Sequence, residues 1–197
     1  MKEQKRKLRR EILQRIKKLT HREIQAKSKA ILKALSETAS WKNADIIYCF
    51  MSMPGEVETE PIIQTALNQN KFVAVPRMGD GNNMNFHRIS SLKANVWELH
   101  SYGIKEPKAD LPILEPKNIA DQNLLIIAPG LAFDRDGNRL GRGKGFYDTY
   151  INAQCNDDVD IIGIAFACQI VDTVPVSGFD CRVKAVITEE GILSHRG

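Results

Sequence analysis

The stretch Leu124–Asp148, LLIIAPGLAFDRDGNRLGRGKGFYD, decides how this chain folds and where its chemistry lies. It begins with an apolar run of strand length that ends at Pro129–Gly130. It leads into FYDTYINA, which can continue as a helix. The glycines between these two segments therefore lie near a strand-to-helix passage, where helix N–H groups and the helix dipole favour anions.

The loop combines glycines with fixed positive charge. Gly141, Gly143 and Gly145 alternate with Arg142 and Lys144, and Arg139 comes just before them. Glycine lets backbone N–H groups approach an anion closely, and three cations favour phosphate or carboxylate. Asp148 adds a hard oxygen ligand suited to Mg²⁺. The loop predicts a phosphate site with a magnesium ligand beside it.

The loop does not match two better-known phosphate-binding motifs, and it could also be a turn without a ligand. A Walker A loop needs a glycine where Asn138 stands, and Ser or Thr where Gly145 stands. The spacing G-x-G-x-G also differs from the dinucleotide fingerprint. The alternative is a glycine-rich turn whose charges are merely solvated. The alternation of glycines and cations favours the phosphate site.

The rest of the chain alternates strand and helix. Helices are expected at 22–37, 60–70 and 146–153. Strands are expected at 44–50, 71–76 (ended by Pro76), 84–89, 124–130, 161–167 and 185–188. This alternation predicts a single α/β domain over residues 1–197, with a mainly parallel sheet covered by helices on both faces. Ligands bind at the carboxyl ends of such strands, so the loops after Phe50, Val75, Ala128 and Ala167 should form the site's rim.

Composition excludes several classes of protein. The chain has 197 residues, 43% of them hydrophobic and 26% charged, and it has no apolar run of membrane-spanning length. Its four cysteines show no C-x-x-C pairing, and Cys49 and Cys168 fall in expected strands. This pattern indicates buried thiols in a reducing cytoplasm rather than a zinc or disulfide framework. The scattered histidines suggest no catalytic triad.

Residues 1–19 predict a basic amphipathic helix. They contain nine Lys or Arg against two Glu, and a helically spaced apolar stripe consists of Leu8, Ile12, Leu13, Ile16 and Leu19. Three interpretations remain open. The helix could pack by its stripe with its cations simply solvated, it could attach to nucleic acid or a membrane surface, or Lys5 and Arg9 could face a polyanion elsewhere in the fold.

Three separated segments carry a family resemblance: KRKLR at 5–9, FMSMPGEVETEPII at 50–63 and PGLAFDRDGNRLGRGKGFYD at 129–148. VPVSGFD at 174–180 is a weaker fourth. In order and spacing the chain resembles the 5-formyltetrahydrofolate cyclo-ligase family over essentially its whole length. The resemblance implies an enzyme that uses ATP and Mg²⁺ to convert 5-formyltetrahydrofolate, with or without a polyglutamate tail, to 5,10-methenyltetrahydrofolate. It implies no nucleic-acid or membrane partner.

The resemblance also implies roles for individual residues. ATP contacts fall on Lys5, Arg9, Arg139, Gly141, Arg142, Gly143, Lys144, Gly145 and Tyr147. Lys144, Arg142 and Tyr147 would be catalytic, with Lys144 best placed to follow the γ-phosphoryl group. Substrate contacts fall on Met51, Glu56, Arg142 and Phe146, and magnesium ligands on Asp148 and Asp180.

The chain departs from the family pattern at two positions. Phe146 stands where the family commonly has Tyr, so a hydroxyl contact is absent there. Lys184 stands at a position that is often acidic, which puts the charge around Asp180, and its role as a metal ligand, in doubt. Neither change affects the cations of the loop.

Other classes of protein remain as alternatives. A nucleic-acid binder would use the basic helix and the Arg-rich loop, but the net charge is only +4 and aromatic and basic residues are not interleaved. A sugar-phosphate isomerase or acyl-CoA transferase-like enzyme would use a similar sheet without ATP. A folate- or nucleotide-binding protein without turnover is a further alternative.

Overall fold

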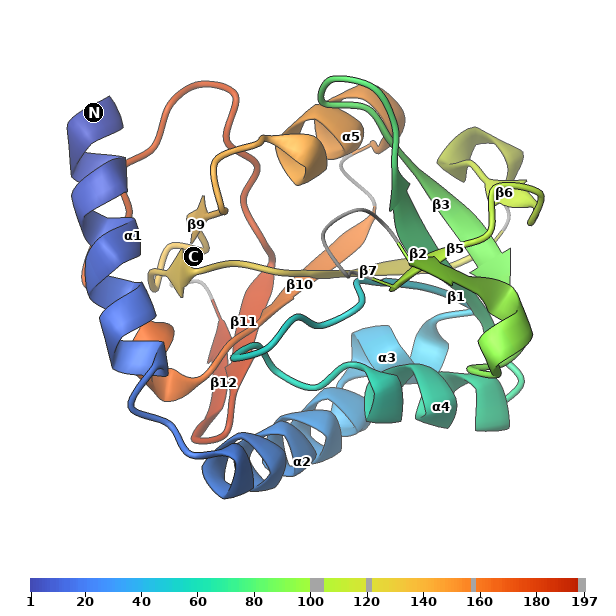
Figure 1. Ribbon diagram of the computed structural model, residues 1–197, viewed down its shortest axis with the longest axis horizontal. Coiled ribbons are helices and arrows are strands. Elements are labelled where there is room, and N and C mark those ends of the chain that lie inside the picture. The colour runs from blue at the N-terminus through green and yellow to red at the C-terminus, as the bar shows by residue number, and fades with distance from the viewer. Residues whose placement is uncertain (100–104, 120–121, 157–158, 195–197) are drawn as a thin grey trace.

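The computed structural model describes residues 1–99, 105–119, 122–156 and 159–194. Within these residues an eight-stranded sheet forms the centre of the molecule (Figure 1). Its order is β12 (Gly191–Ser194), β11 (Ala185–Thr188), β10 (Asp160–Ile164), β7 (Leu124–Ala128), β1 (Ile46–Cys49), β2 (Phe72–Met78), β3 (Met84–Ile89) and β6 (Ile113–Leu114).

The middle of this sheet is parallel. β11, β10, β7, β1 and β2 run in one direction. At the edges, β12 pairs antiparallel with β11, β3 with β2, and β6 with β3. Every residue of β1 and β7 is buried, as expected for strands that are covered on both faces. The carboxyl end of β7 therefore lies between those of β1 and β10, and the glycine loop follows from that end. The predicted α/β class and mainly parallel sheet are confirmed.

Helices cover both faces of the sheet. α2 (His21–Glu37), α3 (Ala39–Asn43) and α4 (Glu60–Asn68) lie on one face, and α5 (Phe146–Gln154) lies on the other (Figure 1). α2 begins at a capping box in which Thr20 and Glu23 satisfy each other's backbone N–H groups. α4 carries Pro61 in its first turn, where a missing N–H costs nothing. No helix of the described residues is both long and apolar enough to cross a membrane.

Short elements complete the fold. β4 (Trp97–Leu99) pairs with β5 (Lys105–Pro107), and β8 (Ala132–Phe133) pairs with β9 (Arg139–Leu140). Single 3₁₀ turns in the described residues are η1 (Ala94–Val96), η2 (Pro116–Asn118) and η3 (Ala167–Gln169). The β8–β9 hairpin lies between β7 and the glycine loop along the chain, so its position determines where the loop lies relative to the sheet.

The N-terminal helix α1 (Lys2–Ile16) packs outside the main sheet, at the left in Figure 1. It has a small core of its own, in which buried Ile12 and Ile16 meet the β8–β9 hairpin and one further loop residue: Leu131, Ala132, Leu140 and Val174. The apolar stripe is thus confirmed at these two positions and at Leu8, which is partly buried against the same core. Leu13 was assigned wrongly, because it is exposed, and Leu19 lies beyond the end of the helix.

Two expected strand ends and one cysteine were also placed wrongly. Pro76 does not end β2, which continues to Met78. The ladder with β1 stops at Tyr48 and Ala74, so β2 continues beside β3 alone, and a proline is tolerated in a strand with one neighbour. The rim loop expected after Val75 therefore starts after Met78. β10 ends at Ile164, and Cys168 belongs to η3 rather than to a strand.

Candidate active site

The glycine loop has a backbone that side chains would disturb. Gly143 has φ +103°, and a Cβ placed on it would lie 3.3 Å from the Arg9 guanidinium carbon. Gly145 has φ +73° and is the N-cap of α5, with no side chain capping the first turn. The loop therefore needs glycine both for its conformation and for the close approach of Arg9. The uncapped N–H groups of α5 are free to bind an anion.

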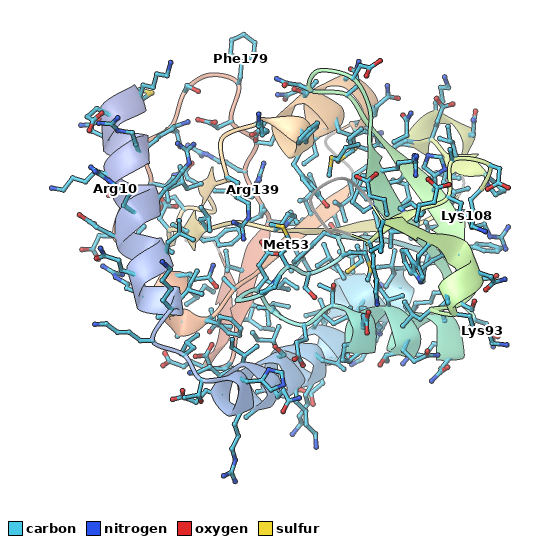
Figure 2. The ribbon with its side chains drawn as sticks, viewed as in Figure 1. Arg10, Met53, Lys93, Lys108, Arg139 and Phe179 are labelled. Carbon is cyan, nitrogen blue, oxygen red and sulfur yellow. The ribbon has the colours of Figure 1, made fainter. Side chains whose placement is uncertain are left out.

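Helix α1 delivers two cations to this loop. The Lys5 Nζ lies 2.5 Å from an Asp180 carboxylate oxygen, and the Arg9 Nε donates to the Gly141 carbonyl oxygen at 2.9 Å. Both side chains thus point inward from one face of α1, one turn apart. By contrast, Arg10 projects away from the body of the protein (Figure 2). Of the three interpretations of this helix, the geometry favours the one in which Lys5 and Arg9 serve a site elsewhere in the fold.

Arg139 lies inside the molecule, between α1 and the sheet (Figure 2). Its side chain is only 3% exposed. Its Nη2 donates to Asp148 Oδ1 at 2.7 Å, and its Nη1 donates to the Pro129 carbonyl oxygen at 3.2 Å. The guanidinium carbon also lies 5.6 Å from the centre of the Tyr147 ring. Arg139 is therefore a buried, fixed cation at the base of the loop.

Arg139 and its neighbour Tyr147 each have a buried polar atom without a hydrogen-bond partner. Among the described residues, the buried side-chain atoms in this condition are Arg139 Nε and the hydroxyl oxygens of Tyr147 and Tyr150. Burial raises the pKa of Tyr147 well above its ordinary value, so its hydroxyl stays protonated and can donate. Buried polar groups are almost always satisfied. The unpaired Arg139 and Tyr147 atoms suit a polar ligand bound against them.

Arg142 bridges the loop to the segment after β1. Its Nη2 and Nε both donate to Glu56 Oε1, at 2.7 and 3.1 Å. The other carboxylate oxygen, Oε2, accepts from the Met53 backbone N–H at 2.9 Å. Glu56 is therefore held by both of its oxygens. The residues expected for ATP and for folate thus meet at one ion pair.

The other expected contact residues have no side-chain hydrogen bond or ion pair that holds them among the described residues. Met51 and Phe146 are partly buried and pack against the main core. Lys144 is exposed and forms no ion pair with the described residues, so its amine is available. The segment that carries Met51 and Glu56 is held in shape by reciprocal backbone–hydroxyl hydrogen bonds between Ser52 and Thr59.

Asp148 and Asp180 are the expected magnesium ligands. Asp148 Oδ1 accepts from Arg139 and from the Cys181 backbone N–H at 3.1 Å, which brings the neighbouring Asp180 close to α5. No cluster of three or more His, Cys, Asp or Glu in the described ranges could hold a metal ion. Mg²⁺ commonly uses one or two carboxylates together with substrate phosphates, so this pair fits that mode of binding. Each carboxylate is paired with a cation here, and their role as ligands stays a prediction.

The charge expected to disturb Asp180 is directed elsewhere. Lys184 forms its ion pair with Asp160, while Asp180 pairs with Lys5. Partial burial would raise the pKa of Asp180, but hydrogen bonds from Lys5 and Ser177 outweigh it, and the pKa lies below its ordinary value. Lys184 therefore does not compete for Asp180.

Sequence reasoning missed several residues of this region. Asn82, in the turn between β2 and β3, approaches the loop: a Cβ placed on Gly145 would lie 3.8 Å from its side-chain nitrogen. No sequence signal marks Asn82, because only strand pairing brings that turn to α5. Asp134 and Asn138 lie within Leu124–Asp148, and their turn-forming spacing could have indicated them.

A family model described as the 5-formyltetrahydrofolate cyclo-ligase family matches residues 1–189. The chain belongs to this family. The 5-formyltetrahydrofolate cyclo-ligase of Mus musculus is 34% identical over 200 residues, covering 94% of both chains. That of Escherichia coli strain K12 is 33% identical over 150 residues, covering 74% of this chain and 78% of the relative.

Solved structures of similar proteins agree with this membership of the cyclo-ligase family. The 5,10-methenyltetrahydrofolate synthetase of Aquifex aeolicus has a TM-score of 0.80 and 26% identity, covering 98% of this chain and 93% of that one. The synthetase of Mycoplasma pneumoniae shares the fold, with a TM-score of 0.73, 20% identity and coverage of 94% and 98%. The chain is accordingly an enzyme of folate metabolism, an ATP-dependent ligase.

Proposed function

We propose that this enzyme cyclises 5-formyltetrahydrofolate to 5,10-methenyltetrahydrofolate, with release of ADP and phosphate. The N5-formyl group is an amide, and its oxygen is a poor leaving group. Transfer of the γ-phosphoryl group to that oxygen breaks the bond to ADP and makes the oxygen part of a phosphate ester. N10 then attacks the formyl carbon and gives up its proton, and phosphate departs as the ring closes.

Such a reaction needs alignment and charge neutralisation more than a protein nucleophile. On this proposal Lys5, Arg9 and Arg139 hold the ATP phosphates with the backbone of the glycine loop. Lys144, exposed and without an ion pair among the described residues, follows the γ-phosphoryl group. Arg142 stands between the two substrates, and the protonated Tyr147 hydroxyl donates to the reacting groups.

Glu56, Met51 and Phe146 would contact the folate. The Glu56 carboxylate already accepts from N–H donors of Met53 and Arg142 at its two oxygens. It can accept from the N–H groups of a pterin in the same way. Asp148 and Asp180 would hold Mg²⁺, which would neutralise phosphate charge when bound. Displacement of Asp148 from Arg139 and of Asp180 from Lys5 would accompany binding, since each cation also has phosphate to bind.

One observation carries the proposal most directly. Cations from two distant parts of the chain, α1 and the segment 139–144, converge on one uncapped helix N-terminus, beside buried polar atoms without partners. This arrangement supports binding of a polyphosphate. The proposal takes the chain as one domain acting in the cytoplasm on a folate with or without a polyglutamate tail.

The test is a direct assay. Purified protein is mixed with Mg-ATP and 5-formyltetrahydrofolate, and the methenyl chromophore is followed in the near ultraviolet while ADP is measured in parallel. We expect product and ADP in equal amounts, and none when ATP is omitted or the metal is chelated. Folded protein that yields neither product nor ADP would exclude this function.

A nucleic-acid-binding function is not favoured by the geometry. That function predicts that the cations of α1 act together at the surface, whereas Lys5 and Arg9 point inward to Asp180 and to the glycine loop. Salt-dependent binding of RNA or DNA, measured beside the assay, tests this alternative.

A further inference from the structure

Asp134 is a buried carboxylate away from the expected contacts. It is only 1% exposed. Oδ1 accepts from the backbone N–H groups of Asp136 at 3.0 Å and Asn138 at 2.9 Å. Oδ2 accepts from the Asn138 side-chain amide and from the Val174 backbone N–H, both at 2.9 Å. Within the described part of the chain no cation pairs with it, so neutral donors alone offset the cost of burying it.

A turn by itself does not need this arrangement. The two contacts to Oδ1 close the turn between β8 and β9, as Asp commonly does. The contact from Oδ2 to Val174 reaches a segment forty residues later, which a local turn does not require. The second oxygen therefore joins two parts of the chain.

Asn138 extends the connection to a third segment. Its side-chain oxygen accepts from Arg182 Nε at 3.0 Å, and the neighbouring Gly137 carbonyl oxygen accepts from the Val183 backbone N–H at 2.9 Å. The hairpin turn is thus fixed to both ends of the segment 174–183. That segment carries Asp180 and Cys181, which contact Lys5 and Asp148 respectively.

The groups joined in this way surround Asp148. Arg139 follows Asn138 directly and donates to Asp148 Oδ1 from one side. Cys181 precedes Arg182 directly, and its N–H donates to the same oxygen. We propose that Asp134 is the positioning residue of this site: through Asn138 and Val174 it sets Arg139 and the Asp180–Cys181 segment in register around Asp148. The inference rests on the proposed function, because it assigns this arrangement to the ATP and metal side of the reaction.

The carboxylate is required at this position because every contact is a donor. Asparagine has the same shape but replaces one oxygen by NH₂. Each carboxylate oxygen accepts from two N–H groups. Whichever way the asparagine amide is turned, its NH₂ group would therefore face two N–H donors and accept from neither. Asp134→Asn should therefore loosen the register with little change in volume. Asp136→Asn is the matched control, since it makes the same substitution two residues along the same turn, at an exposed position.

The experiment compares steady-state kinetics of the two variants, with the folded fraction of each measured by circular dichroism. For Asp134→Asn we expect a loss of about tenfold or more in kcat/KM for ATP, as for groups that orient ligands from behind. The KM for 5-formyltetrahydrofolate, measured at saturating ATP, should stay unchanged, because among the described residues Asp134 forms no hydrogen bond with Glu56 or Arg142. Asp136→Asn should match the wild type. A folded Asp134→Asn protein with wild-type kinetics for ATP would overturn the proposal.

Two further measurements keep the test decisive. Should Asp134→Asn fail to fold, exposed Arg182→Ala removes only the outer hydrogen bond to Asn138, and an unchanged KM for ATP would then overturn the proposal. Nitrogen-15 NMR of the Arg139 guanidinium needs no turnover. Its Nη–H signals, assigned with Arg139→Lys, should be resolved in the wild type and averaged in Asp134→Asn. Equal spectra would overturn the positioning role, whereas an inactive wild type would overturn only the proposed reaction.

Discussion

At the scale of single residues, each proposed cation differs in what already holds it. Arg139 is buried and paired with Asp148, Lys5 is paired with Asp180, and Lys144 has no ion-pair partner in the described ranges. A free, exposed amine can move with a group that moves, whereas a buried guanidinium keeps its place. The three should therefore contribute differently to binding and to turnover.

Lys144→Ala should lower kcat by about a hundredfold, as when one preorganised donor to a developing charge is removed. The KM for 5-formyltetrahydrofolate should change little, because an interaction made mainly with the moving phosphoryl group is absent from the ground state. Steady-state kinetics of the variant beside Lys29→Ala, an exposed lysine on α2, give the comparison. A near-normal kcat would remove Lys144 from the mechanism.

Asp180 should make stability depend on pH in acid. Partial burial by itself would raise the pKa of Asp180. The hydrogen bonds from Lys5 and Ser177 lower it by more, so the pKa in the folded protein lies below that in the unfolded chain. The contribution is therefore present above the unfolded pKa of about 4 and is lost as pH falls through the folded value. Thermal unfolding between pH 6 and acid should show a shallower loss for Asp180→Asn and for Lys5→Met. The wild-type slope in both variants would contradict this.

At the scale of elements, α1 combines two roles on one helix. Its inward face places Ile12 and Ile16 against the β8–β9 hairpin, and Lys5 and Arg9 reach the site from the N-terminal half. Packing and binding residues are thus separate along the helix, so they can be separated by mutation.

Lys5→Ala and Arg9→Ala should each raise the KM for ATP. Each variant loses a phosphate contact worth about 1–3 kcal/mol of binding free energy, as for hydrogen bonds to charged groups. Exposed Lys17→Ala should leave it unchanged. Equal effects of all three on RNA or DNA binding, with no change in KM, would instead support the nucleic-acid interpretation. Deletion of residues 1–9 gives a coarse version of the test: a folded protein with an unchanged KM for ATP would exclude α1 from the nucleotide site.

Ile12→Ala should act on stability instead. Ile12 is fully buried in the small core under α1, so its truncation should cost about 2–5 kcal/mol of unfolding free energy. Leu13→Ala is the matched control, because Leu13 is the adjacent residue and is exposed. Urea unfolding of the two variants measures the difference, and equal midpoints would show that the small core contributes no stability.

At the scale of the whole molecule, the Arg142–Glu56 pair links the loop after β9 to the segment after β1. Glu56 is assigned to the folate, and Arg142 is assigned to both ATP and the folate. A ligand that draws Arg142 away leaves Glu56 Oε1 free for the other ligand, so the binding of the two substrates should be coupled and reciprocal.

A non-hydrolysable ATP analogue should therefore tighten folate binding, by about fivefold or more for a coupling of ordinary size. Titration calorimetry with and without the analogue measures this. In Arg142→Gln the coupling should disappear, whereas in Lys29→Ala it should persist. Independent binding of the two ligands to the wild-type protein would refute the coupling.

Much of the fold followed from sequence because the physical signals are local. Apolar runs of strand length between amphipathic segments can bury both faces only in a covered parallel sheet, and β1, β7 and β10 fall on those runs, although β10 ends at Ile164, earlier than expected. Pro76 misled because its effect depends on whether a second strand lies beside it, which the residue itself does not show. Cys168 misled because a partly buried 3₁₀ turn and the end of a strand have similar composition.

The sequence by itself determined the family, the sheet, the glycine loop and the helix that follows it, since these depend on spacing within short segments. Only the tertiary structure decided which charges meet. Lys5 and Asp180 are 175 positions apart, and Arg142 and Glu56 are 86 apart. Which carboxylate a cation reaches depends on strand order and helix packing, and Lys184 shows this, since it pairs with Asp160 and not with Asp180. The hydrogen bonds of Asp134 were likewise decided by the tertiary structure, because the fourth donor to its carboxylate is the Val174 N–H, which only the folded chain brings near.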